Sequence, residues 1–149
     1  MTYSYLALRD SYTIGEGVPL YENFPYQAVK NLRRAGYAFH APEIIARTGW
    51  TTDELQQGID QFPLLNRYHF VSLLIGVNNQ YRGRSISVYA QEFAALLQQA
   101  IGFALNERNH VFVLSIPDWG VTPFAEGRDR GLIAKEIDAF NNAALEIAQ

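Results

Sequence analysis

The stretch Tyr5–Gly17, YLALRDSYTIGEG, decides how the rest of the chain can be interpreted. An alternating apolar run breaks into the triplet Arg9, Asp10 and Ser11, and two glycines follow shortly after. This pattern predicts a first β-strand that delivers Ser11 to a turn at its C-terminal end. Ligands of open α/β sheets bind at that edge, so Ser11 is the first candidate functional residue.

Segments with strand character alternate with amphipathic segments along the remaining chain. A loop is predicted over residues 13–25, and further strands are predicted over residues 43–46, 68–75 and 111–116. Helices are predicted over residues 26–35, about 51–61, 85–106 and 128–148. This alternation favours a parallel sheet with right-handed crossovers. No repeat or linker interrupts the pattern, so residues 1–149 are expected to form a single α/β domain.

Composition excludes several classes of function. The 149 residues are 48% hydrophobic and 18% charged, which is typical of a folded globular domain. A net charge of -3 gives no electrostatic reason to expect a nucleic-acid partner. The absence of cysteine excludes disulfides, zinc–thiolate sites and thiol nucleophiles. We find neither a leader pattern nor an apolar run of roughly 20 residues, so we expect a cytoplasmic chain with no membrane span.

Three polar or small residues follow three of the predicted strands. Ser11 follows the first strand, Gly49 the second and Asn78 the third. The carboxyl ends of parallel strands meet at one edge, so these residues are expected to converge. Acyl transfer needs a nucleophile with hydrogen-bond donors about 3 Å from the developing oxyanion. Ser11 is the candidate nucleophile, and its own amide, the Gly49 amide and the Asn78 side chain are candidate oxyanion donors.

The same positions resemble the SGNH, or GDSL-type, family of esterases and lipases. Ser11 matches the serine of the family's Gly-Asp-Ser block, Gly49 its second-block glycine, and Asn78 the asparagine of its Gly-x-Asn-Asp block. Supporting positions of these blocks are taken by Asp10, Gly76 and Asn79. The last of these stands where the family has aspartate. Residues 116–123, IPDWGVTP, also resemble the loop that walls the acyl side of the family's cleft.

This resemblance implies a three-layer, flavodoxin-like parallel sheet with strand order 2-1-3-4. It also implies hydrolysis of a small carboxylic ester through an acyl-serine intermediate, with no metal and no cofactor. The alternative is a non-catalytic α/β module that binds a small acid or ester in the same cleft, or that serves in assembly. A phosphate site on residues 13–17 is disfavoured, because this loop lacks the lysine and the spacing of a P-loop.

The general base that activates the family's serine comes from an Asp-x-x-His block, and no such block follows here. His40, His69 and His110 instead precede the second, third and fourth predicted strands. Strands of this length place that edge roughly 17 to 23 Å from Ser11. A base must lie within hydrogen-bond reach, so we interpret these histidines as structural residues at strand entries.

The fourth predicted strand and the last predicted helix carry so much apolar surface that packing against each other would leave part of it exposed. Residues 111–114 are apolar on both faces of the strand. The helix stripe consists of Leu132, Ile133, Ile137, Phe140 and Leu145. We therefore expect a domain that lacks the family's fifth strand, is inactive or very slow alone, and is completed by self-association or by a complementing C-terminal segment.

Arginine at position 9 is the second departure from the family's blocks. Glycine beside Asp10 permits a tight backbone turn, which arginine would strain. Alternatively, the long side chain of Arg9 projects into the cleft or reaches solvent. The sequence leaves these possibilities open.

Overall fold

The computed structural model describes residues 1–11 and 18–149, and a four-stranded parallel sheet lies at its centre. Its strands are β1 (Tyr5–Arg9), β2 (Glu43–Ala46), β3 (Phe70–Leu74) and β4 (Val111–Val113). Their order is β2-β1-β3-β4, and each neighbouring pair is parallel. This confirms the predicted order 2-1-3-4. The predicted loop and the disfavoured phosphate site fall wholly or partly on residues 12–17, outside the described residues.

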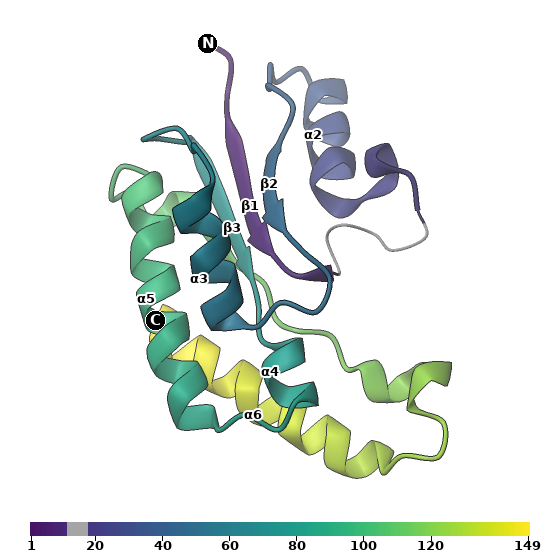
Figure 1. Cartoon of the computed structure of the whole chain (residues 1–149). Helices are drawn as coiled ribbons and strands as arrows, with labels where there is room; N and C mark the ends of the chain where they lie inside the picture. Colours follow the sequence, from purple (N-terminus) through teal and green to yellow (C-terminus); the bar gives the residue numbers. More distant parts are fainter. Residues whose placement is uncertain (12–17) are drawn as a thin grey trace.

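Helices pack on both faces of this sheet. Figure 1 shows α2 on one side, beside β1 and β2, and α3 and α5 on the other side. The helical elements in chain order are η1 (Leu20–Glu22), α2 (Phe24–Arg34), α3 (Thr52–Gln61), α4 (Val77–Tyr81), α5 (Ile86–Phe103), η2 (Arg108–His110), η3 (Trp119–Val121), η4 (Pro123–Ala125) and α6 (Arg130–Ala148). The three-layer α/β architecture expected from the sequence is therefore present.

Both faces of β1 are buried, which explains why its sequence is a continuous apolar run. Leu6 and Leu8 belong to the larger core, which also contains residues of α3, α5 and α6. Tyr5 and Ala7 belong to a smaller core with Val29 of α2. A strand covered by helices on both faces needs apolar residues at every position.

The structure differs from the predicted elements at two places. The strand predicted to end at residue 116 ends at Val113. The backbone N–H and carbonyl of Ile116 are instead bonded to the side chain of Asn141 in α6, at 2.8 and 2.9 Å. The first helix after β3 is α4, which precedes the helix predicted over residues 85–106 and has Gly76 as its N-cap.

The apolar surface of β4 is only partly covered in the described structure. Phe112 is 52% exposed. A groove of about 630 Å³ lies beside β4 and is also lined by residues of α5 and α6. The α6 stripe is better covered than expected, because Ile137 and Phe140 are buried and the Phe140 ring lies 4.7 Å from the Tyr89 ring of α5. The exposed residues of the stripe are Leu132 and Leu145.

Substituting Gly76 with alanine is expected to destabilise the fold by about 2 to 4 kcal/mol. Gly76 has a φ of +137°, and an added Cβ would lie 2.8 Å from the Tyr89 ring. Tyr89 cannot move freely, since its hydroxyl donates to the Ile75 carbonyl at 3.0 Å. Urea unfolding measures the loss. The matched control is Gly102→Ala in α5, which has open space around it and is expected to gain about 0.5 to 1 kcal/mol. Equal effects of the two substitutions would contradict this account.

Candidate active site

The register of the sheet brings three loops to one edge. Arg9, at the end of β1, pairs with Ala46 of β2 and with Leu74 of β3. The three strands therefore end at the same level, and the chain continues from them to Ser11, Gly49 and Asn78 respectively. Ser11 is half-buried. The predicted convergence at one edge of the sheet is thus present at the level of the backbone.

The loop after β2 is a tight turn around Gly49. The Trp50 N–H donates to the Arg47 carbonyl at 3.3 Å, which closes the turn. Gly49 has a φ of +82° at its third position, where a type II turn requires a positive φ. A residue with a Cβ is strained in this conformation, so glycine is needed here. The turn fixes the direction of the peptide that carries the Gly49 N–H.

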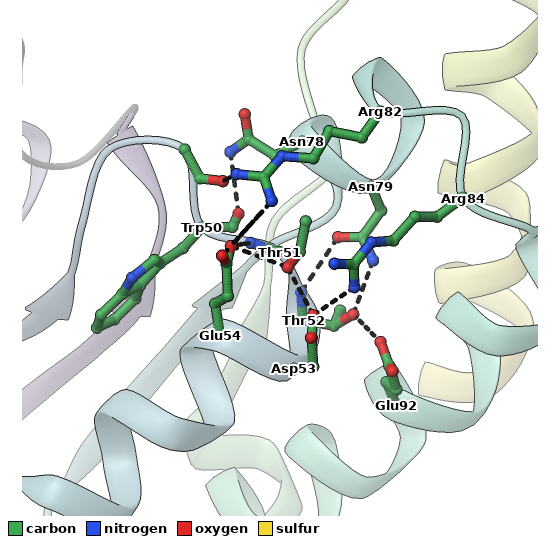
Figure 2. Close-up of polar contacts among 11 residues, drawn as sticks. Trp50, Thr51, Thr52, Asp53, Glu54, Asn78, Asn79, Arg82, Arg84 and Glu92 are labelled. Carbon is green, nitrogen blue, oxygen red and sulfur yellow. Dashed lines mark hydrogen bonds and ion pairs between the residues drawn. The ribbon is translucent and has the colours of Figure 1, made fainter.

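A side-chain hydrogen bond joins the loop after β3 to this turn. Asn78 lies in α4, and its Nδ2 donates to the Trp50 carbonyl at 2.9 Å. A side-chain amide nitrogen carries two hydrogens, so this contact uses one and orients the other. Figure 2 shows the Asn78 side chain lying over the loop that holds Trp50. The second and third loops therefore form one connected unit.

Two arginine–carboxylate pairs brace the same unit from the start of α3. Arg82 Nη1 lies 3.4 Å from Glu54, and Arg84 Nη1 lies 2.5 Å from Asp53 (Figure 2). The Thr51 N–H is the main cause that lowers the pKa of Glu54, and Arg82 adds to it. Desolvation acts to raise the pKa of Asp53, but its hydrogen bonds with Thr51 and Arg84 outweigh that effect and lower it. Both carboxylates are therefore held in the charged form.

Asn79, which stands where the SGNH blocks have aspartate, lies at the centre of a buried polar chain. Its Oδ1 accepts from the Thr52 N–H at 3.2 Å, and its Nδ2 donates to the Thr52 hydroxyl at 2.7 Å. That hydroxyl in turn donates to Glu92 (Figure 2). A carboxylate at position 79 has no hydrogen to give the hydroxyl. The Asn79 amide therefore suits this position, because the Thr52 hydroxyl already donates its hydrogen to the Glu92 carboxylate.

The structure decides the position of Arg9 against two of the possibilities left open by the sequence, backbone strain and exposure to solvent. Its side chain is buried, and its guanidinium carbon lies 4.4 Å from the centre of the Phe24 ring at the start of α2. Its φ is not positive, so the backbone is not strained by the loss of glycine. Desolvation lowers the pKa of Arg9, while the charges of Tyr5 and Asp10 act to raise it. Arg9 thus packs against the start of α2 instead of reaching solvent.

Asp10 is fully buried on the other side of β1. Desolvation is the main cause that raises the pKa of Tyr89, and the negative charge of Asp10 raises it further. The last residue of β1 and the residue after it are therefore buried toward different helices, Arg9 toward α2 and Asp10 toward α5.

The segment predicted to wall the cleft forms an aromatic cluster next to α4. Trp119 donates through Nε1 to Gln80 at 2.8 Å, and its ring contacts Tyr81 and Phe124 at centroid distances of 5.4 and 5.7 Å. The Arg128 guanidinium lies 5.0 Å from the Tyr81 ring centre. Trp119 therefore packs against α4, the helix that carries Asn78.

The three histidines lie at the opposite edge of the sheet. His69 immediately precedes β3, and its Nδ1 accepts from the Ser4 N–H at 3.0 Å. His110 precedes β4, where its ring contacts that of Phe70 at 5.2 Å. His40 pairs through its N–H with the Tyr3 carbonyl. The prediction that they are strand-entry residues is confirmed.

Sequence reasoning missed Arg82, Arg84 and Glu92. Each acts through a contact with a residue about 30 to 40 positions away in the chain, namely Gly49, Asp53 and Thr52. A usable signal was present, since both arginines lie within a few residues after the Gly-Val-Asn-Asn block. That signal does not identify the partners of the arginines unless the pairing of the strands that precede these loops is known.

Over residues 1–11 and 18–149, no three side chains of histidine, aspartate or glutamate are grouped so as to hold a metal ion. No helix in that part of the chain is long and apolar enough to cross a membrane.

The arrangement of the fold and of its three loops agrees with a family comparison. The model of the GDSL-like lipase/acylhydrolase family matches residues 10–149. The chain therefore belongs to the GDSL-like lipase/acylhydrolase family. A search of curated proteins gave no significant match.

Solved structures show the same fold at low sequence identity. AlinE4, an SGNH-hydrolase family esterase, is similar with a TM-score of 0.73 and 21% identity, over 99% of this chain and 71% of its own. TesA gives a TM-score of 0.75 at 18% identity, over 97% of this chain and 72% of its own. A catalytic mutant of Axe2, an acetylxylan esterase from Geobacillus stearothermophilus, gives 0.64 at 17% identity, over 98% and 71%. At these identities the similarity shows the fold.

Changing Asn79 to aspartate is expected to destabilise the protein by about 1 to 3 kcal/mol. The new carboxylate would face a hydroxyl that already donates to Glu92. The double variant Asn79→Asp with Glu92→Gln is expected to recover most of the loss, because a glutamine amide can donate to the hydroxyl and free its hydrogen for the aspartate. A double-mutant cycle by thermal unfolding measures the coupling. Strictly additive effects would refute the proposed chain of hydrogen bonds.

Proposed function

We propose that this chain is a carboxylic ester hydrolase of the SGNH type with Ser11 as its nucleophile. The backbone N–H groups of Ser11 and Gly49 and the side-chain amide of Asn78 act as oxyanion donors. The single observation that carries the proposal is the hydrogen bond from Asn78 to the Trp50 carbonyl at the edge where β1 delivers Ser11. That contact ties two candidate donors into one rigid unit.

The reaction proceeds in two steps. The Ser11 oxygen attacks the ester carbonyl carbon, and the carbonyl oxygen takes the negative charge that the donors stabilise. Collapse of this intermediate breaks the ester C–O bond, releases the alcohol after it gains a proton, and leaves an acyl-serine. Water then attacks the acyl carbon and releases the acid, which returns the Ser11 hydroxyl.

The step that removes the Ser11 proton needs a base from outside the described residues. His40, His69 and His110 precede strands at the far edge of the sheet, which supports this inference. We place the base on a segment that packs against β4, either further polypeptide or a complementing chain. Phe112 and the groove beside β4 offer the uncovered surface for it. The 149 residues alone are then inactive or very slow, with a residual rate from the oxyanion donors.

Ester hydrolysis by the 149-residue chain is expected to be slow and to depend on Ser11. With a short-chain nitrophenyl ester, Ser11→Ala should abolish turnover, and Asn78→Ala should lower kcat by about 10²- to 10³-fold. The exposed Ser87→Ala in α5 serves as the control and should match the parent rate. Turnover that is unaffected by Ser11→Ala would refute the site and favour a binding or assembly module with the same cleft.

The uncovered β4 edge is expected to promote self-association. Exposed strand edges with apolar side chains pair readily with other chains. Analytical ultracentrifugation should show mass rising with concentration, and Phe112→Asp should shift the equilibrium toward monomer. Val121→Asp in η3 replaces an apolar residue that is even more exposed, at 75%, and lies outside β4, so it is the control. A monomer at all concentrations, or equal effects of both substitutions, would contradict association through this edge.

A further inference from the structure

We propose that Arg82 is a positioning residue that holds the Gly49 and Asn78 oxyanion donors in one fixed arrangement. This inference deepens the proposed function and rests on it. Arg82 is the C-cap residue of α4, directly beyond the helix that carries Asn78. It contacts both donor loops, one through its backbone and the other through its side chain.

The side chain of Arg82 holds the second loop. Its Nη2 donates to the Gly49 carbonyl at 2.6 Å, and its Nη1 lies 3.4 Å from the Glu54 carboxylate. Figure 2 shows the guanidinium reaching across from α4 to the loop at the start of α3. Glu54 is itself fixed, because it accepts from the Thr51 N–H at 2.9 Å in the capping box of α3. The Arg82 guanidinium is therefore held by two partners, the Gly49 carbonyl and the Glu54 carboxylate.

The backbone of Arg82 holds the third loop. Its N–H donates to the Asn78 carbonyl at 3.0 Å, which closes the turn of α4 that orients the Asn78 side chain. One residue thus bonds the carbonyl of each donor residue. A shift of either loop would have to break a contact with Arg82.

Holding the Gly49 carbonyl also fixes the Gly49 N–H. The Trp50 N–H to Arg47 bond sets the turn, and the φ of +82° is available to glycine at little cost. The same freedom lets Gly49 rotate about its ψ dihedral unless its own carbonyl is held in place. Arg82 bonds that carbonyl, and within the described part of the chain no acceptor occupies the Gly49 N–H. The Gly49 N–H is then held in one orientation, in which it can donate to an oxyanion.

Arginine suits this role better than lysine. Its planar guanidinium presents several N–H donors in a fixed fork, so it can bond a carbonyl and a carboxylate at once. The neighbouring Glu54 offsets its charge, so the effect on the oxyanion is through geometry more than through the field of the cation. Loss of Arg82 should therefore lower kcat more than it changes KM.

Arg84→Ala is the matched control for Arg82→Ala. Arg84 also follows α4, pairs with a carboxylate at the start of α3, and donates its backbone N–H to the Asn79 carbonyl. It makes no bond to Gly49 in the described structure. Each variant therefore removes a comparable ion pair, but only Arg82→Ala also removes the hydrogen bond to the Gly49 carbonyl.

The experiment measures nitrophenyl ester turnover and backbone amide exchange by NMR on the same 149-residue chain. Arg82→Ala is expected to lower kcat about tenfold with KM changed less than twofold. The Trp50 amide, which closes the turn, should exchange at least fivefold faster. Arg84→Ala should leave both within twofold of the parent. Faster exchange with unchanged kcat, or unchanged exchange, would overturn the proposal.

Two results separate this inference from the proposed function. If Ser11→Ala leaves turnover unaffected, the proposed function fails whatever Arg82 does. If the chain shows no detectable turnover, the rate at which an ethylphosphonate ester labels Ser11 is measured in place of kcat, by the gain in protein mass. The phosphonyl oxygen of the labelled serine takes the position of the oxyanion. Slower labelling of Arg82→Ala than of Arg84→Ala supports the positioning role, and equal labelling rates overturn it.

Discussion

Parallel pairing of β1 with both β2 and β3 is the constraint on which the rest of the structure depends. Because Arg9 is level with Ala46 and Leu74, the chain leaves three strands at one height. Residues widely separated in sequence then meet without long loops. The burial of β1 on both faces fixes this register, since a shift by one residue would exchange its two sets of side chains between the cores.

Polar contacts between the segment after β2 and the segment after β3 form the second layer of constraints on the site. Asn78, Arg82 and Asn79 reach from α4 to the turn and helix that follow β2. These contacts are made largely to backbone atoms and capping groups, so they specify position more than they add stability. The Arg82–Glu54 ion pair is partly exposed, and its value lies in fixing the guanidinium that bonds the Gly49 carbonyl.

Sequence patterns predicted the strand positions and the edge on which Ser11, Gly49 and Asn78 lie, because periodicity and strand-end residues are local signals. The strand order came from the resemblance to the SGNH family. The sequence patterns did not predict the end of β4, which depends on Asn141 from α6 capping the backbone of Ile116. Nor did they predict Arg82, whose partner is 33 residues away. The burial of Arg9 beneath Phe24 was likewise not readable, because it depends on where α2 begins relative to β1.

The central place of β1 also has a consequence for how the chain acquires its structure. It is the first of the four strands along the sequence, yet Tyr5 pairs with Phe70, so one of its two partners is distant along the chain. Pairing across such a separation requires closing a long loop before any contact compensates for the lost entropy. The strand that precedes Ser11 therefore completes its pairing with β3 only once that long loop has closed.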